Sequence, residues 1–156
     1  MRTQALISKY DPIYRIDNTH VRDEWTSYHD IGKQFADGTL TKSQYKQVEG
    51  QYVGCILTMA KLCGVKTFRI RNLEIYRRHP KWVQNQKIGL DEAELFIRDC
   101  LKNYYWGRVV GRNFELKFGQ DYYFNINSVL SRDEVEYAVA QHSLYVRDFV
   151  ELTQTK

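Results

Sequence analysis

The feature that most restricts the fold is one long amphipathic segment, residues 42–63. Thr41 and Gln44 at its start have the spacing of a capping box, in which each side chain satisfies a free backbone amide. Gly64 follows the segment, where a left-handed C-cap belongs. The apolar stripe of the predicted helix consists of Tyr45, Val48, Tyr52, Cys55, Ile56, Met59 and Leu62. A stripe of this length must be buried against another element of the fold.

A sheet is predicted to provide that element. We expect strands at three places: residues 4–9, residues 66–76 and the two arms of a hairpin over 113–128. In the second of these, apolar residues alternate with Arg69 and Arg71, which is the period-two pattern of a half-buried strand. The hairpin would turn at 119–121. Gly107 and Gly111 are interpreted as turns that precede the hairpin.

Three further segments predict helices: residues 22–35, 91–103 and 132–152. Asp91 with Glu94, and Ser131 with Glu134, have capping-box spacing. His142 falls on the apolar face of the last helix and is interpreted as a hydrogen-bonded core histidine. Together these elements predict a single α+β domain over residues 1–156, with three to four helices packed on a small, mostly antiparallel sheet.

The composition is that of an ordinary globular protein. A chain of 156 residues with 43% hydrophobic residues can bury a core without disulfides or metals. No run approaches the ~18 apolar residues of a membrane span, and the first residues lack the apolar centre of a signal peptide. Cys55, Cys63 and Cys100 are an odd number without a close pair, so we expect reduced thiols. We therefore expect a soluble cytoplasmic protein with no membrane partner.

The four histidines do not have the spacing of a metal site. His20, His29, His79 and His142 form none of the HxH, HxxxH or HExxH patterns. The sequence also lacks a glycine-rich phosphate loop. We therefore expect that the protein is not an enzyme and that it has no metal, no cofactor and no small-molecule ligand.

Two catalytic alternatives stay open. Glu115 and Lys117 form an E-x-K on a predicted strand, which metal-dependent nucleases use together with an aspartate on a neighbouring strand. Ser27, His29 and Asp30 are the residue types of a catalytic triad, but sequence neighbours rarely form one because the geometry comes from distant segments.

Positive charge gathers in the middle of the chain. Residues 65–117 carry 12 lysines and arginines against 6 acidic residues, whereas residues 118–156 carry 3 against 6. Residues 69–87 interleave cations with Tyr76 and Trp82, and this composition suits RNA binding. The net charge of only +4 is modest for a nucleic-acid-binding protein. The same stretch could equally meet an acidic protein surface.

Tyrosine is unusually frequent, with 12 residues, and Tyr, Trp and Arg dominate interface hot spots. Tyr104, Tyr105 and Trp106 follow a predicted helix end, where loops often bind; burial of at least two of these rings is the alternative. Tyr122 and Tyr123 alternate across a strand, so at most one faces the core. The candidate partner-binding residues are Arg69, Arg71, Tyr76, Arg77, Arg78, Trp82, Tyr104, Tyr105, Trp106 and Tyr122.

Roughly the first third of the chain resembles a known family. Residues 23–56 are similar to the N-terminal part of bacterial immunity proteins from contact-dependent growth inhibition and other polymorphic toxin systems. The matching features are DEWTS at 23–27, DIGK at 30–33, Leu40-Thr41 ahead of a helix with Tyr45, Val48 and Tyr52, and KYDPIYR at 9–15.

The resemblance implies a protein that binds the C-terminal toxin domain of a large effector and blocks its active site or substrate path. Such toxins are often nucleases, and an EndoU-type RNase is the specific expectation. Immunity proteins against basic nucleases tend to be acidic, whereas this chain is net positive. Either the toxin presents an acidic face, or contact runs through a local acidic patch of Glu134, Glu136, Asp148 and Glu151. An RNA-binding module built on residues 69–87 is the alternative function.

Overall fold

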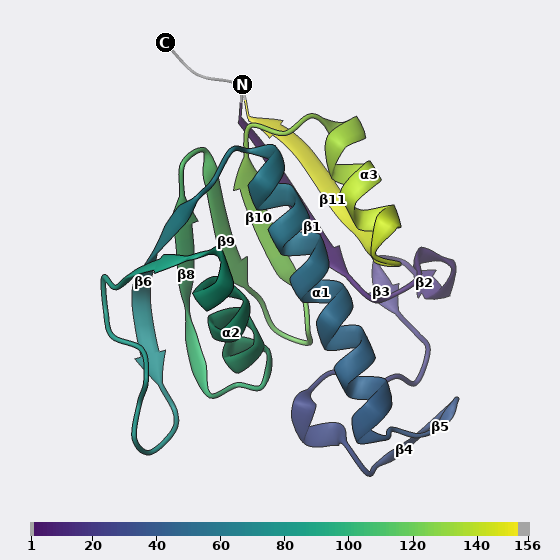
Figure 1. Ribbon diagram of the computed structural model, residues 1–156. Coiled ribbons are helices and arrows are strands. Elements are labelled where there is room, and N and C mark those ends of the chain that lie inside the picture. The colour runs from purple at the N-terminus through teal and green to yellow at the C-terminus, as the bar shows by residue number, and fades with distance from the viewer. Residues whose placement is uncertain (1, 153–156) are drawn as a thin grey trace.

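The computed structural model describes residues 2–152, which build one seven-stranded sheet with three α-helices against a single face (Figure 1). The strands follow the order β11-β1-β10-β9-β8-β6-β7, and all neighbours are antiparallel. Their bounds are β1 Arg2–Ser8, β6 Thr67–Ile75, β7 Lys87–Gly89, β8 Tyr105–Gly111, β9 Phe114–Phe118, β10 Phe124–Ser128 and β11 Tyr145–Leu152.

The three helices form the second layer, with α1 between the other two (Figure 1). Their bounds are α1 Lys42–Leu62, α2 Leu90–Leu101 and α3 Arg132–Gln141. The predicted α+β class with helices packed on an antiparallel sheet is confirmed. The sheet is larger than predicted. The short strand β7 is not predicted, and β8 and β11 form from segments where the sequence pattern predicts turns and a helix.

Short elements connect β1 to α1 outside the main sheet (Figure 1). They are the 3-10 turns Pro12–Tyr14 and Tyr28–Asp30 and two small hairpins, formed by β2 Arg15–Ile16 with β3 Thr19–His20 and by β4 Gln34–Phe35 with β5 Gly38–Thr39. The predicted helix over 22–35 is therefore wrong. Its apolar residues sit at helical spacing, but Trp25, Tyr28, Ile31 and Phe35 each pack separately against the core from an irregular backbone. Gly32, at φ +93°, turns the chain out of helical geometry.

The core lies between the helices and the sheet and is rich in aromatic rings. Tyr45 and Tyr52 of α1 are fully buried, and both rings contact Tyr122. Trp25 packs against Tyr45 and Tyr122 at centroid distances of 5.5 and 4.9 Å. The hydroxyl groups remain satisfied inside this cluster, since Tyr52 Oη donates to the Tyr122 carbonyl at 2.8 Å and Tyr122 Oη to Tyr45 Oη at 3.0 Å.

The predicted helix starts are confirmed for two of the three helices. The Thr41–Gln44 capping box opens α1, and the Ser131–Glu134 capping box opens α3. Helix α2 begins one residue earlier than predicted, and Glu92 accepts from the Gly89 amide at 3.3 Å. Gly64, at φ +78°, ends α1 as expected.

The last predicted helix is too long. Helix α3 ends at Gln141, Ser143 adopts φ +57°, and residues 145–152 form β11 beside β1. Gly107 and Gly111 also differ from the prediction, since both lie within β8. A Cβ on Gly107 would stand 3.2 Å from the Arg71 carbonyl, so glycine permits the close approach of β8 to β6. Within residues 2–152, none of the helices combines the length and the hydrophobicity that crossing a bilayer requires.

Candidate functional site: the open face of the sheet

One face of the sheet is free of helices (Figure 1). Side chains alternate between the two faces along each strand. In β6, Phe68 and Ile70 are buried under the helices, whereas Arg69 and Arg71 point to the opposite side. β8, β9 and β10 repeat this alternation, so the side turned away from the helices presents mostly polar and charged side chains, together with Leu6, Trp106, Val110 and Val150. We refer to this side as the open face.

Strand register brings cations from three neighbouring strands into one row on the open face. Arg71 of β6 lies opposite Arg108 of β8, and Arg108 lies opposite Lys117 of β9. Neighbouring strands are about 4.8 Å apart, so these are direct cross-strand neighbours. A second like-charged pair, Arg69 with Lys87 of β7, adjoins the row. We call these five residues the cation row.

The cation row has little internal compensation. Arg108 donates to Glu115 at 2.7 Å, and Lys117 Nζ lies 4.0 Å from the same carboxylate oxygen. Among residues 2–152, no carboxylate comes within 4.0 Å of the charged groups of Arg69, Arg71 or Lys87.

Asparagine groups satisfy part of the hydrogen-bonding capacity of the arginines without neutralising their charge. Arg69 donates to the Asn85 carbonyl at 3.0 Å, Arg71 donates to the Asn85 side chain, and Arg108 Nε donates to Asn72 at 2.7 Å. The guanidinium groups are therefore oriented while they keep most of their attraction for an external anion.

Two hollows lie beside the row and share Glu115 and Asn127. The smaller, of about 160 Å³, is wholly polar or charged and is lined by Gln4, Arg108, Glu115, Lys117, Asn125 and Asn127. The larger, of about 430 Å³, continues towards Arg2 and Leu152. The open face is thus a shallow polar surface that is suited to binding side chains of a partner rather than to enclosing a small molecule.

Several predicted binding residues are accessible. Arg69 and Arg71 lie on the open face, and Trp106 shares it with Arg108, with 39% of its surface exposed. Tyr76, Arg77 and Arg78 lie in the exposed loop after β6. The Arg77 guanidinium sits over the half-buried Tyr104 ring at 4.7 Å.

Three predicted binding residues are instead part of the core. Trp82 is only 1% exposed, since its ring packs on Phe96 and its Nε1 donates to Asp99 at 2.9 Å. Tyr105, at the start of β8, is also 1% exposed, and its hydroxyl accepts from the Lys81 amide at 2.8 Å. Tyr122 is buried among the tyrosines of α1. These rings stabilise the fold and cannot contact a partner directly.

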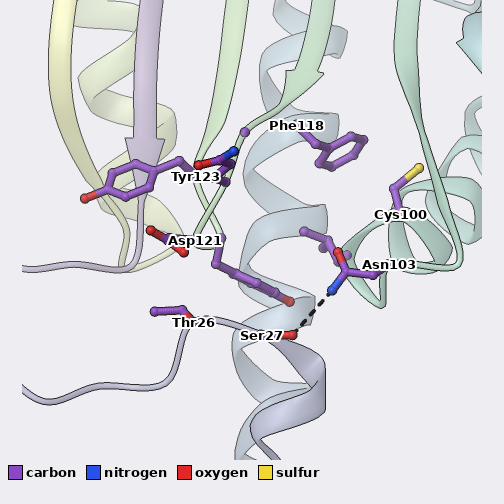
Figure 2. A pocket seen from close by; sticks show the side chains of 11 residues that line it. Thr26, Ser27, Cys100, Asn103, Phe118, Asp121 and Tyr123 are labelled. Carbon is purple, nitrogen blue, oxygen red and sulfur yellow. Dashed lines mark hydrogen bonds between the residues drawn. The ribbon is translucent and has the colours of Figure 1, made fainter. Parts of the chain in front are cut away.

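A pocket of about 360 Å³ lies between the end of α2, the β9–β10 turn and the segment before the second 3-10 turn (Figure 2). Phe118, Leu101 and Cys100 contribute apolar surface, and Asn103 donates to Ser27 at 3.3 Å across its rim. Burial raises the pKa of the Cys100 thiol well above its ordinary value, which makes this cysteine a poor nucleophile.

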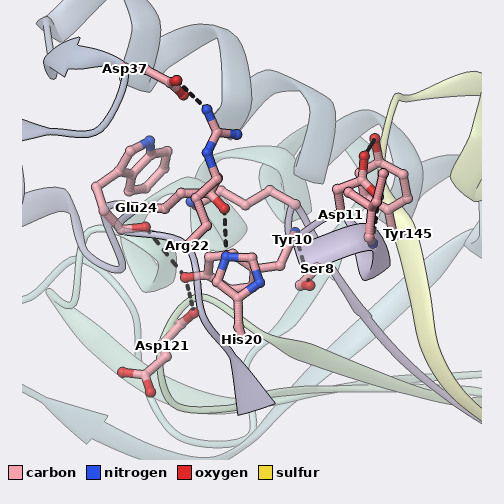
Figure 3. A network of polar contacts seen from close by, with 12 residues as sticks. Ser8, Tyr10, Asp11, His20, Arg22, Glu24, Asp37, Asp121 and Tyr145 are labelled. Atoms are coloured by element: carbon pink, nitrogen blue, oxygen red, sulfur yellow. Dashed lines mark hydrogen bonds and ion pairs between the residues drawn. The ribbon is translucent and has the colours of Figure 1, made fainter. Parts of the chain in front are cut away.

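A polar network fastens the segment between β1 and α1 to the sheet (Figure 3). Tyr10 Oη donates to the Asp121 carbonyl at 2.6 Å, and the His20 ring stacks on Tyr10 at 4.7 Å. Glu24 contacts His20 at 2.5 Å and lies 3.8 Å from Lys9 Nζ. The network contains one histidine, and its members contact one another and the backbone. We therefore interpret it as a network that stabilises the fold.

The proposed triad residues do not form a relay. Ser27 Oγ accepts from the backbone amide of His29 at 3.1 Å, which makes it a turn cap. Asp30 accepts from the Thr26 amide at 2.9 Å and pairs with Lys33 at 3.1 Å.

Glu115 and Lys117 do share one face of β9, as an E-x-K site requires. Their cross-strand neighbours are Arg108, Val110, Asn125 and Asn127. Within the described part of the chain, no cluster of three or more His, Cys, Asp or Glu residues has a metal-binding arrangement.

No family model, no curated protein and no solved structure matches this chain. Function must therefore be inferred from the site geometry together with the resemblance in residues 23–56.

Proposed function

We propose that this chain is an immunity-type binding protein that neutralises the C-terminal toxin domain of a contact-dependent growth inhibition effector. The toxin would be a nuclease, with an EndoU-type RNase as the specific proposal, and it would be blocked in the cytoplasm. The observation that carries the proposal is the open face, where the oriented Arg69 and Arg71 lack carboxylate partners and the neighbouring Arg108 lines a shallow polar hollow. A binding role needs such a surface and requires no catalytic cluster.

Only part of the segment that carries the family resemblance lies in the core, and many of its residues are exposed. Trp25, Tyr45 and Tyr52 pack around Tyr122, on the helix side of the sheet. A resemblance in such residues supports a shared fold and does not by itself identify the partner. The contact surface must be inferred from the open face and from the loop that holds Arg77 and Arg78.

The acidic alternative is less well supported. Glu134 and Glu136 lie on α3, on the helix side, and Glu151 has the register of the buried Thr3 on the same side, whereas Asp148 has the register of Leu6, on the open face. Glu136 pairs with Arg132 at 3.4 Å, and Asp148 lies 4.0 Å from Arg147. These acids do not form one uncompensated surface, so a toxin with an acidic contact face suits this chain better.

Co-expression tests the proposal. The chain would be produced together with the variable C-terminal domain of the effector encoded directly upstream. We expect a one-to-one complex on size exclusion with light scattering, and normal growth of cells that otherwise die from the toxin domain. Absence of an effector gene there, or a toxin domain that neither binds nor is neutralised, would remove the proposal.

RNA binding is the second candidate, because Trp106 stands beside Arg108 on the open face. A cation next to an exposed ring is a common RNA-binding arrangement. A single-stranded RNA should then bind with an affinity that falls steeply with salt. Absence of binding at low salt would exclude this candidate.

A further inference from the structure

We propose that the partner contacts the cation row with an acidic protein segment, and that Glu115 is the internal counter-ion that limits the affinity of this contact. The identity of the partner as a toxin rests on the proposed function. The location and the charge of the contact rest on strand register and side-chain contacts alone.

The cation row is unfavourable for the free protein. Like charges directly opposite one another in a sheet are destabilising. Arg71, Arg108 and Lys117 make two such pairs, and Arg69 with Lys87 makes a third. An anionic partner would convert this repulsion into attraction. Positions that break a local rule of sheet stability are where a functional surface is expected.

Glu115 lies at the one point where the free protein compensates for the row. Its Oε1 contacts both Arg108 and Lys117, and it lines both hollows, of which the smaller is wholly polar or charged. A carboxylate from a partner would therefore enter a site where one carboxylate already stands. Removal of the Glu115 charge should increase the affinity for an acidic partner and decrease the affinity for a basic one. The sign of this effect reports the charge of the partner.

The open face favours protein over nucleic acid. Nucleobases are held by stacking on aromatic side chains in the centre of a sheet. The open-facing residues of β9, β10 and β1 are Glu115, Lys117, Asn125, Asn127, Arg2, Gln4 and Leu6, and none of them is aromatic. Trp106 is separated from these central strands, since it lies at the far end of β8 and pairs with Glu74 of β6. Amides with cations and a few aliphatic residues are typical of a hydrated protein interface.

The first experiment measures binding to two defined probes. A fluorescein-labelled 20-residue polyglutamate and a labelled 20-nucleotide oligouridine are titrated with the full chain at 50 mM NaCl. Polyglutamate should bind more tightly than oligouridine. Tighter binding of the RNA, or absence of polyglutamate binding, would overturn the proposal.

Three variants locate the contact. Lys117→Glu should weaken polyglutamate binding about tenfold, and Glu115→Gln should tighten it about threefold, because both change charge within the row. Lys46→Glu makes the same charge change on an exposed position of α1 and should stay within about twofold of the wild type. Lys117 has an exposed side chain, and unchanged thermal unfolding would establish that its variant folds. Equal losses in Lys117→Glu and Lys46→Glu would show a net-charge effect only and contradict the proposal.

The toxin domain provides an independent arm. If it binds the wild type and Lys117→Glu equally, the cation row is not the contact, although the proposed function survives. If it does not bind the wild type at all, the proposed function fails, and the polyglutamate measurements still decide whether the row recognises an acidic segment.

Discussion

Lys9 lies in an unfavourable environment for a charged group. Its Nζ lies 4.2 Å from the Tyr10 ring centroid and 4.3 Å from that of Trp25, with Glu24 at 3.8 Å. The ammonium group has no hydrogen-bond partner among residues 2–152. Burial lowers the pKa of Lys9 to about 8, and the nearby Glu24 offsets only part of this shift.

Replacement of Lys9 by Met should stabilise the protein at pH 7 by about 1–2 kcal/mol, because a buried charge is exchanged for an apolar side chain of similar length. In the wild type, the unfolded chain holds the Lys9 proton more strongly than the folded one. The contribution of Lys9 to stability therefore rises between pH 8 and the ordinary pKa of 10.5.

The advantage of Lys9→Met should thus shrink across this window, by at most about 1.4 kcal/mol per pH unit. Urea unfolding of both proteins from pH 7 to 10 measures the difference in their free energies of unfolding. The titration of the buried tyrosines is common to both proteins and largely cancels in this difference. A stability gap that stays constant with pH would contradict the account.

Substitutions of Trp82 and of Arg78 should differ in their effect on stability, because Trp82 is a core residue and Arg78 is exposed. Trp82→Ala should lower the free energy of unfolding by about 3–5 kcal/mol, since it removes a buried ring that packs on Phe96. Arg78→Ala, in the exposed loop, should change it by less than about 0.5 kcal/mol. Urea denaturation gives both values. A marginal effect of Trp82→Ala would show that the ring is not a core residue.

The sequence could not reveal the position of Trp82. Its neighbours Lys81 and Val83 are exposed, and residues 76–86 have no period from which an inward side chain could be read. The ring turns back to α2 because Phe96 and Asp99 lie there. That contact joins residues 17 positions apart, and local patterns do not encode it.

At the scale of elements, α1 contains two glycines in different surroundings. A Cβ on Gly50 would meet nothing within 4 Å, whereas a Cβ on Gly54 would stand 2.6 Å from the His142 ring at the end of α3. Thr58 lies 3.0 Å from Nε2 of that ring, so the predicted hydrogen bond is confirmed, but His142 is half-buried at the end of the helix and is not a core residue. Gly54 therefore allows the close contact between α1 and α3.

The two glycines should respond oppositely to alanine. Gly50→Ala should stabilise the protein by about 0.5–1 kcal/mol through helix propensity. Gly54→Ala should destabilise it by about 1–3 kcal/mol, because the methyl group overpacks the contact with His142. Thermal unfolding of the pair provides a matched comparison within one helix. Stabilisation by both changes would show that the His142 ring moves aside without cost.

Helix α1 could be predicted because its signals are local. The Thr41–Gln44 capping box, the apolar stripe and Gly64 all act within a few residues of the helix. Strand β11 could not, since Tyr145, Val146 and Phe149 have spacings that also fit a helix. Pairing with β1, more than 130 positions earlier in the sequence, decides the outcome.

At the scale of the whole molecule, the two faces of the sheet differ in what they carry. The helix side holds the core, and the open face carries the cation row. The sequence indicated Arg69 and Arg71 as candidates but not Arg108, and Lys117 was considered only for metal chemistry. The cation row depends on the register of β6, β8 and β9. This register cannot be derived from counts of charged residues along the chain.

Arg71→Thr should make the free protein more stable and a worse binder. Removal of one like-charged pair should add about 0.2–1 kcal/mol at 20 mM NaCl, and Thr suits a strand position. The gain should shrink at 0.5 M NaCl, where exposed charges are screened. Urea titrations at both salt concentrations measure it. A gain that is independent of salt, or a loss at low salt, would show that the row is not under electrostatic strain.

The alternation of side chains along β6 and β9 has a consequence for how such a protein can diversify. Ile70, in the core, stands between Arg69 and Arg71, and Leu116 stands between Glu115 and Lys117. Substitutions at every second codon can therefore rewrite the outward surface while the interior stays the same. Proteins with this fold could therefore adapt their outward surface to a changing binding partner while the packing of the core is kept.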